Sequence, residues 1–96
     1  MSDETIFSSQ FKRLYAAKRK KSSKELMKKV NDGISELRNA DRPEMIGVRK
    51  KGKLQNFYSY EISEGHRILY RVERKDGTVL VHLHRVCDHK NVYGKD

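Results

Sequence analysis

The sequence predicts an α+β domain in the order β-α-α-β-β-β, with a helical hairpin packed on one face of a mainly antiparallel sheet. Apolar residues recur at helical spacing through residues 8–39, which indicates two helices. The run from Phe57 to Val72 consists of two strand-like halves around Ser63-Glu64-Gly65, the pattern of a hairpin. Asp76-Gly77 indicates a second tight turn and therefore a third strand in the same sheet.

Composition limits the domain count and the kind of partner. The 96 residues suffice for one domain, spanning 1–96, and 22 Lys and Arg against 13 Asp and Glu give a net charge of +9. That charge suits a nucleic acid, an anionic membrane surface or an acidic protein. The single cysteine, Cys87, excludes an intrachain disulfide and favours a reducing compartment. The sequence has no secretory signal and no apolar run of membrane length, so we expect a cytoplasmic protein without a membrane partner.

The first third of the chain predicts a short strand followed by a helix. Residues 5–7 form the strand, and Ser8 or Ser9 caps the helix, because a serine oxygen accepts from the free amides of a first turn. The helix buries one stripe, formed by Phe11, Leu14 and Tyr15. Residues 18–21 are four cations, which indicate a solvated helix end rather than a phosphate-binding patch.

A second helix follows directly. Ser22 and Glu25 have the spacing of a capping box, and the helix should continue to about Asn39. Its apolar stripe consists of Leu26, Met27, Val30, Ile34 and Leu37. Gly33 lies inside the helix at a cost of roughly 1 kcal/mol relative to alanine. Either it permits a close approach to the sheet or it has no role.

A basic loop leads into the hairpin. Pro43 ends the helical region, residues 44–48 are weakly strand-like, and residues 49–53 place four cations around Gly52. Cations beside a nucleic-acid site position the phosphate backbone without reading the bases. The candidate phosphate contacts in this loop are Lys50, Lys51 and Lys53, and ordinary solvated surface is the alternative.

The strand after the hairpin turn has two different faces. Ile68, Tyr70 and Val72 share one face, while the other carries Arg67, Leu69 and Arg71. We expect the apolar face to pack against the helices and the cationic face to receive a polyanion. In the last strand, residues 78–86, the alternation changes near its end, so the pattern does not identify its buried face.

Three stretches of this sequence resemble the RelE/ParE toxin superfamily. Arg67 lies in GHRILY, preceded by YSYEISE, and this hairpin is similar to that of YoeB-type mRNA interferases. The tail RVCDHKNVYG is similar to YafQ-type relatives, which carry an arginine, a histidine four residues later and then an aromatic. The resemblance implies a RelE-like fold and the toxin of a type II toxin–antitoxin system. It also implies a metal-independent endoribonuclease that needs no cofactor and cleaves mRNA at the ribosome.

The resemblance further implies partners and site residues. The partners are a cognate antitoxin, mRNA and the ribosome, with a homodimer as a further expectation. Cleavage by the 2′-hydroxyl needs a base, cations for the phosphorane and an acid for the leaving 5′ oxygen. Arg67 and Arg85 suit the cationic role, and His89 suits proton transfer. Tyr93 would orient the phosphate or stack on a base, and Tyr58 and Tyr60 would stack as well.

The identity of the base stays open in the sequence. The two lysines that RelE carries before its hairpin turn correspond to Tyr58 and Tyr60 here, and the catalytic glutamate of YoeB-type enzymes falls near Val48. Glu44 and Glu61 are the alternatives. A two-residue turn would send Glu61 to the face opposite Arg67, whereas a three-residue turn would pair the two. The absence of these lysines and of this glutamate favours a competing function. The chain would then be a non-nuclease binding protein, such as a gyrase-directed toxin or an inactive relative. A generic basic RNA-binding domain is a third interpretation, and the lack of RRM and KH motifs in the sequence argues against it.

Overall fold

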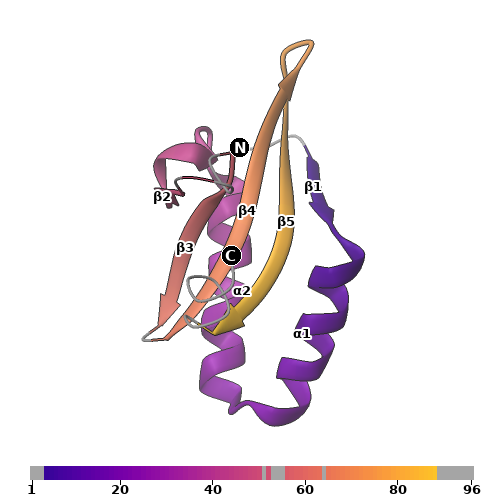
Figure 1. Cartoon of the computed structure of the whole chain (residues 1–96), viewed down its shortest axis with the longest axis vertical. Helices are drawn as coiled ribbons and strands as arrows, with labels where there is room; N and C mark the ends of the chain where they lie inside the picture. The colour runs from indigo at the N-terminus through magenta and orange to yellow at the C-terminus, as the bar shows by residue number, and fades with distance from the viewer. Residues whose placement is uncertain (1–3, 51, 53–55, 64, 89–96) are drawn as a thin grey trace.

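One mixed sheet and two helices form the domain. The computed structural model describes residues 4–50, 52, 56–63 and 65–88. The described strands form a five-stranded sheet in the order β1-β5-β4-β3-β2, in which β1 runs parallel to β5 and the other neighbours are antiparallel (Figure 1). This confirms the predicted α+β class and helical hairpin. Strand β2 (Val48–Arg49) adds a short edge strand to the predicted order.

The junction of β1 (Glu4–Phe7) and α1 (Ser9–Lys21) is tied to the sheet through Ser8. Ser8 is the N-cap: its hydroxyl accepts from the Phe11 amide at 2.9 Å and donates to the His84 carbonyl at 2.7 Å. One residue therefore ends the strand, starts the helix and fixes both on β5. The cations of residues 18–21 occupy the last turn of α1, which agrees with the predicted helix end.

Helix α2 (Lys24–Asn39) begins one residue later than the capping box predicts. The N-cap is Ser23, whose hydroxyl accepts from the Leu26 amide at 3.1 Å, because Ser22 instead ends α1. Gly33 is buried, and a Cβ at that position would lie 2.9 Å from Cε1 of Tyr60. Of the two alternatives for Gly33, the structure therefore supports the first: the glycine permits a close approach of α2 to the sheet.

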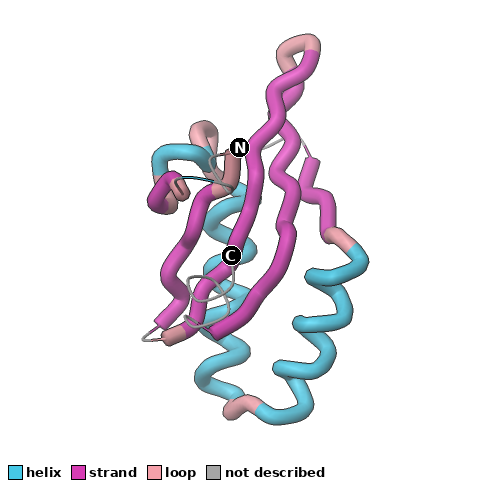
Figure 2. Tube along the Cα trace, viewed as in Figure 1, coloured by secondary structure: helices cyan, strands magenta, loops and turns pink. Residues whose placement is uncertain are grey.

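The two long strands make a hairpin that extends beyond the rest of the sheet. These are β4 (His66–Lys75) and β5 (Thr78–Asp88), which run together well past β3 (Tyr58–Ser63) (Figures 1 and 2). The turn between them places Asp76 and Gly77 at φ 51° and 81°. Two successive residues in the left-handed region suit a tight hairpin turn, as the Asp-Gly pair predicts.

A bulge in β5 resolves the mixed alternation of its sequence. Leu69 pairs with Arg85 but Tyr70 pairs with Leu83, so His84 is an extra residue in the ladder. The side chains before and after the bulge can consequently face the same way. The core receives Val81 and Leu83 from one side of the bulge and Val86 from the other.

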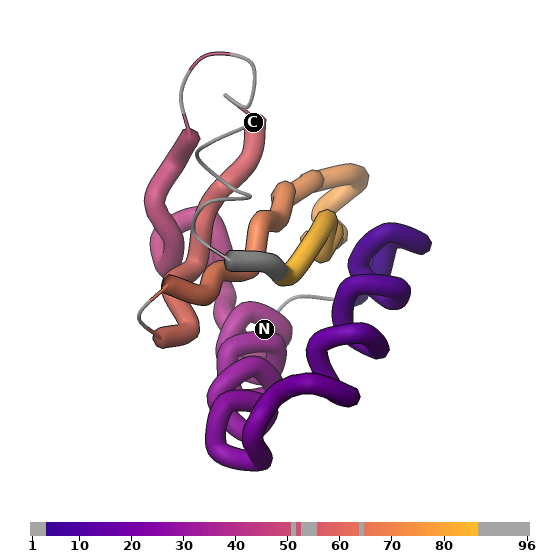
Figure 3. The backbone as a smooth tube through the Cα atoms, turned by 60° about the horizontal axis from the view of Figure 1, so that its bottom comes forward, coloured from indigo at the N-terminus to yellow at the C-terminus, as the bar shows by residue number. Residues whose placement is uncertain are grey.

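The core lies between the sheet and the two helices, which cover the same face (Figure 3). Helix α1 contacts β5 and α2 contacts β3. The largest fully buried side chains in this core are Tyr70, Phe11, Leu37 and Ile68. No helix in the described part of the chain is long and apolar enough to cross a membrane.

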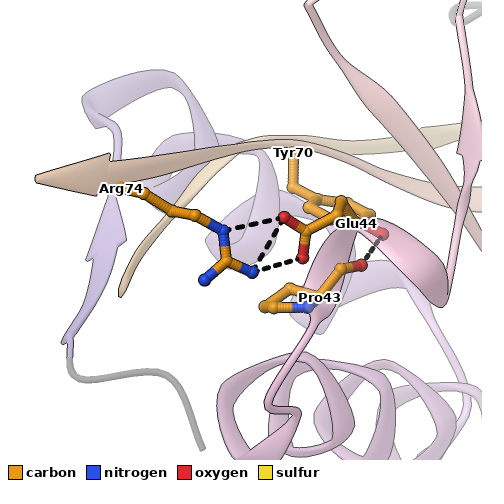
Figure 4. Close-up of polar contacts among 4 residues, drawn as sticks. All are labelled: Pro43, Glu44, Tyr70 and Arg74. Carbon is orange, nitrogen blue, oxygen red and sulfur yellow. Dashed lines mark hydrogen bonds and ion pairs between the residues drawn. The ribbon is translucent and has the colours of Figure 1, made fainter. Parts of the chain in front are cut away.

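Tyr70 also fixes the short 3-10 helix Pro43–Met45 to the sheet. Its hydroxyl donates to the Pro43 carbonyl at 2.7 Å and accepts from the Gly47 amide at 2.9 Å. Beside it, Glu44 forms a bidentate ion pair with Arg74, with Oε1 2.8 Å from Nη2 (Figure 4). The segment that leads into β2 and the basic loop is therefore held by β4.

Candidate nucleic-acid interface

The sheet face turned away from the helices carries the candidate site, and we name it the far face. Ile68 and Tyr70 of β4 lie in the core, so the residues between and beside them point the other way. The register adds side chains from β3 and β5 to this surface. The far face thus includes Ser59, Glu61, Arg67, Leu69, Arg71, His84 and Arg85, and it continues toward the end of the β4–β5 hairpin with Glu73 and His82. The predicted division of β4 into an apolar and a cationic face is confirmed.

Arg67 and Glu61 form the centre of the far face. They are direct partners in the β3–β4 ladder, and Nη2 of Arg67 lies 3.5 Å from Oε2 of Glu61. The Arg67 side chain is 18% exposed and that of Glu61 is 59% exposed, so both reach solvent. A carboxylate that can accept a proton therefore stands beside a guanidinium that can bind a phosphate.

The register of this pair combines features of both sequence alternatives. Ser63 pairs with His66, so only two residues lie between the strands. A simple two-residue turn would then send Glu61 away from Arg67, but the ladder shifts between Glu61 and Ser63. This bulge leaves Ile62 as the extra residue and returns Glu61 to the position opposite Arg67.

Arg85 supplies a second cation near Arg67. It pairs with Leu69, two residues along β4 from Arg67, which makes Arg85 and Arg67 diagonal neighbours on the far face. Such neighbours have Cα atoms about 7–8 Å apart, within the reach of two long side chains. Arg67 and Arg85 are therefore brought together as the sequence predicts, and both can contact one phosphodiester.

Aromatic rings lie next to these cations. The rings of Phe57 and His84 have centroids 4.9 Å apart, although one residue precedes β3 and the other belongs to β5. The two rings must therefore meet across β4, near Leu69. Leu69 is fully buried despite its position on the far face. The pattern of β4 and β5 gave no sign of this contact, because it depends on the bulge at His84.

Tyr58 and Tyr60 lie on the opposite side of the sheet, packed against the core. Tyr58 stacks on Tyr70 with centroids 5.5 Å apart, and the Tyr60 hydroxyl donates to Glu36. Burial, and then the hydrogen bond with Glu36, raise the pKa of Tyr60 to about 12. Neither ring neighbours Arg67, so neither belongs to the group around Arg67 and Glu61, although Tyr58 also lines a pocket at the start of β3. The bulge at Ile62 puts both rings in register with Tyr70 and Ile68, on the helix side.

The basic loop joins the site at Phe57. The Lys50 amide donates to the Phe57 carbonyl at 2.9 Å. This hydrogen bond closes the loop next to Phe57, whose ring contacts His84. Lys50 is thus carried at the edge of the far face. The predicted phosphate contacts Lys51 and Lys53, and the predicted catalytic residues His89 and Tyr93, lie outside the described residues.

Glu44, the other candidate base, lies far from Arg67. Its carboxylate is held by Arg74, seven residues along β4 from Arg67, or about 23 Å at the rise of a strand. Glu61 is therefore the candidate base that the structure places beside Arg67. Among the described residues, no three His, Cys, Asp or Glu side chains gather as metal ligands would.

Known structures share this fold. YafQ from E. coli strain BL21(DE3) superposes with a TM-score of 0.76 at 14% identity, covering 98% of this chain and 100% of YafQ. A YoeB/ParE toxin from Agrobacterium tumefaciens gives 0.70 at 21% identity, covering 90% and 98%. The YoeB-YefM complex from Staphylococcus aureus gives 0.65 at 24% identity, covering 88% and 94%. No protein-family model and no curated protein matches the chain. At these identities the likeness establishes that the chain has the RelE-like toxin fold.

Proposed function

We propose that this chain, built on the fold of the YoeB and YafQ toxins, is the toxin of a type II toxin–antitoxin system. We propose further that it is an endoribonuclease that cleaves mRNA at the ribosome. The observation that carries the proposal is the pairing of Glu61 with Arg67 on the far face, with Arg85 diagonal to them. The net charge of +9 suits a polyanionic substrate.

The proposed reaction uses the substrate's own 2′-hydroxyl. Glu61 removes the proton from this hydroxyl, and the 2′ oxygen attacks the adjacent phosphorus. Arg67 and Arg85 bind the non-bridging oxygens, whose negative charge grows in the phosphorane. The bond from phosphorus to the 5′ oxygen then breaks, and the leaving oxygen takes a proton, for which His89 is the proposed donor. The products are a 2′,3′-cyclic phosphate and a 5′-hydroxyl.

The proposed mechanism needs no metal and no cofactor. The base, the cations and the acid are all side chains of this chain, and a guanidinium stays protonated at every physiological pH. Tyr93 would orient the scissile phosphate or stack on a base. The proposed phosphate contacts at the rim are Lys50, Lys51 and Lys53.

The proposed protein partner is an acidic antitoxin. The similar structures include the YoeB-YefM complex from Staphylococcus aureus and the DinJ-YafQ complex from E. coli. A partner that covers the cationic far face would keep RNA away from Arg67. A homodimer and a cytoplasmic location remain further proposals.

A non-nuclease binding protein is the second candidate function. It is favoured by the shortage of cations on β3, where the far face carries Ser59 and Glu61 rather than lysines. A gyrase-directed toxin would be one such protein. Its expression would cause DNA damage and filamentation, whereas an mRNA nuclease would arrest translation.

Expression of wild-type protein and of Arg67→Ala separates these functions. We expect the wild type to stop growth and to produce new mRNA ends in primer extension, and Arg67→Ala to do neither. Arg13→Ala is the matched control, because it removes one exposed arginine from α1 on the other side of the sheet. Filamentation with intact mRNA would favour the second candidate, and growth arrest by Arg67→Ala would refute the proposed site.

A further inference from the structure

A second basic feature lies at the place where β3 begins, where the far face meets the open edge of the sheet. Tyr58, the first residue of β3, pairs with Tyr70, but β4 continues to Lys75. The step between the two strands forms a pocket of about 270 Å³. Its lining is mainly polar and consists of Arg49, Asn56, Tyr58, Arg71, Val72 and Glu73.

Two arginines from different strands line the pocket, Arg71 from the far face and Arg49 from the side of Tyr58. Arg49 belongs to β2 and Arg71 to β4, and both line the same space. Two arginines converging on one pocket suit a phosphate group, since each can donate two parallel hydrogen bonds to its oxygens. The amide of Asn56 offers a donor and an acceptor at the same wall, as contact with a base edge requires.

The one carboxylate in the pocket is already engaged. Oε1 of Glu73 lies 2.8 Å from Nε2 of His82. The hydrogen bond with His82, and more weakly the charges of Arg71 and Lys75, lower the pKa of Glu73. Glu73 is therefore directed toward β5, and its negative charge is offset by neighbouring groups.

The pocket lies too far from Arg67 to share a phosphate with it. Arg67 and Arg71 are four residues apart on the same face of β4, or about 13 Å at the rise of a strand. The contact between the rings of Phe57 and His84 crosses β4 near Leu69, between the two arginines. The order along the far face is therefore cation, aromatic ring, cation. This order suits a single strand with phosphates at both ends and an unstacked base between them.

We propose that the pocket of Arg49 and Arg71 is a second phosphate subsite for single-stranded RNA, with Phe57 stacking on the base that separates it from the phosphate at Arg67. The subsite rests on the proposed function, because it takes RNA to be the substrate of the far face. It would fix the direction of the strand and select substrates that extend beyond the cleaved bond. It predicts that affinity depends on RNA length.

Fluorescence anisotropy with 2′-O-methyl oligonucleotides of two, four and six nucleotides tests the subsite. These probes lack the attacking hydroxyl and stay intact during the measurement. For the wild type we expect affinity to rise with length. For Arg49→Ala/Arg71→Ala we expect at least a tenfold loss with the hexamer, little change with the dimer, and a shallower dependence on salt. The double variant Arg13→Ala/Lys29→Ala has the same net charge and removes exposed helix residues, so it should stay within about threefold of wild type.

Phe57→Leu is a second test that keeps an apolar side chain over Leu69. Loss of a stacked base should weaken hexamer binding by roughly 5- to 150-fold, while thermal unfolding shows that the fold is intact. If Arg49→Ala/Arg71→Ala and Phe57→Leu bind every length like wild type while Arg67→Ala loses binding, the subsite is refuted and the proposed function stands. If the wild type binds no oligonucleotide of any length, the subsite is refuted, and cleavage of mRNA on programmed ribosomes then decides the proposed function separately.

Discussion

Glu61 and Arg67 face each other across β3 and β4, with Oε2 and Nη2 3.5 Å apart, on the side of the sheet that the helices leave uncovered. The pair places a proton acceptor next to a permanent cation. Because Glu61 is 59% exposed, a nucleic acid can reach the carboxylate without any rearrangement of the core. The relationship depends on a single extra residue, Ile62, in the strand that carries Glu61.

Replacement of Glu61 by glutamine tests its role as the base. Glu61→Gln keeps the size and polarity of the side chain but cannot accept a proton at neutral pH. We expect the rate of RNA cleavage to fall by about 10²–10⁴-fold, while RNA affinity is kept or improves as a negative charge leaves the site. Single-turnover cleavage and anisotropy measure the two quantities. Glu25→Gln on α2 is the control, and a loss of less than threefold in Glu61→Gln would assign the proton transfer to another group.

The Tyr70 hydroxyl should contribute measurably to stability. It is fully buried, and it bonds both the Pro43 carbonyl and the Gly47 amide. Tyr70→Phe leaves these two groups without that partner, so we expect the free energy of unfolding to fall by about 1–3 kcal/mol in urea denaturation. Tyr15→Phe is the control, because the Tyr15 hydroxyl makes one exposed bond with Asn31 and its loss should cost less. Equal losses in the two variants would contradict the role of Tyr70.

Gly33→Ala should destabilise the protein although alanine is the better helix former. A Cβ at position 33 would lie 2.9 Å from the Tyr60 ring, so either the ring or α2 has to move. We expect a cost of about 1–3 kcal/mol from this overpacking, reduced by the roughly 1 kcal/mol that alanine gains in helix propensity.

A double-mutant cycle isolates the contact of Gly33 with Tyr60. In a Tyr60→Ala background the ring is gone, and Gly33→Ala should become neutral or stabilising in urea denaturation. If Gly33→Ala destabilises both backgrounds equally, the close approach of α2 to Tyr60 is not the cause.

The raised pKa of Tyr60 predicts a loss of stability at alkaline pH. The pKa of Tyr60 is about 12 in the folded protein against the ordinary tyrosine value of 10.0, so the folded state holds its proton where the unfolded state has lost it. Stability attributable to Tyr60 is therefore complete below pH 10 and declines as the pH rises toward 12. Chemical denaturation across this range should show a shallower decline in Tyr60→Phe. An identical slope in both proteins would refute the shift.

Much of the fold can be predicted from the sequence, because in most elements the apolar residues recur at a single spacing, either that of a helix or that of a strand. The stripe of α2 and the Asp76-Gly77 turn correctly predict a helix and a hairpin. The sequence could not place the two bulges. The changed alternation near the end of residues 78–86 is a trace of the bulge at His84 but does not say which residue is extra, and the bulge at Ile62 leaves no such trace. The two bulges determine which side chains meet at the site. The bulge at Ile62 places Glu61 opposite Arg67, and the bulge at His84 brings the His84 ring to Phe57.

The errors at the site have the same origin. Tyr58 and Tyr60 are candidates for stacking on RNA, but the bulge at Ile62 puts them in register with Tyr70 and Ile68. The bulge moves both rings to the helix side, where they pack against the core. Arg67 and Arg85 lie together on the far face because β4 alternates without interruption from Arg67 to Arg71 and because Arg85 pairs with Leu69.

Analysis of RNA ends tests the central proposal most directly. Purified wild-type protein and Arg67→Ala would be added to ribosomes programmed with a defined mRNA, in parallel with the Arg13→Ala control. We predict that wild type and control produce fragments with a 2′,3′-cyclic phosphate and a 5′-hydroxyl, and that Arg67→Ala produces none. Equal cleavage by Arg67→Ala, or fragments with 5′-phosphate ends, would contradict a reaction centred on Arg67.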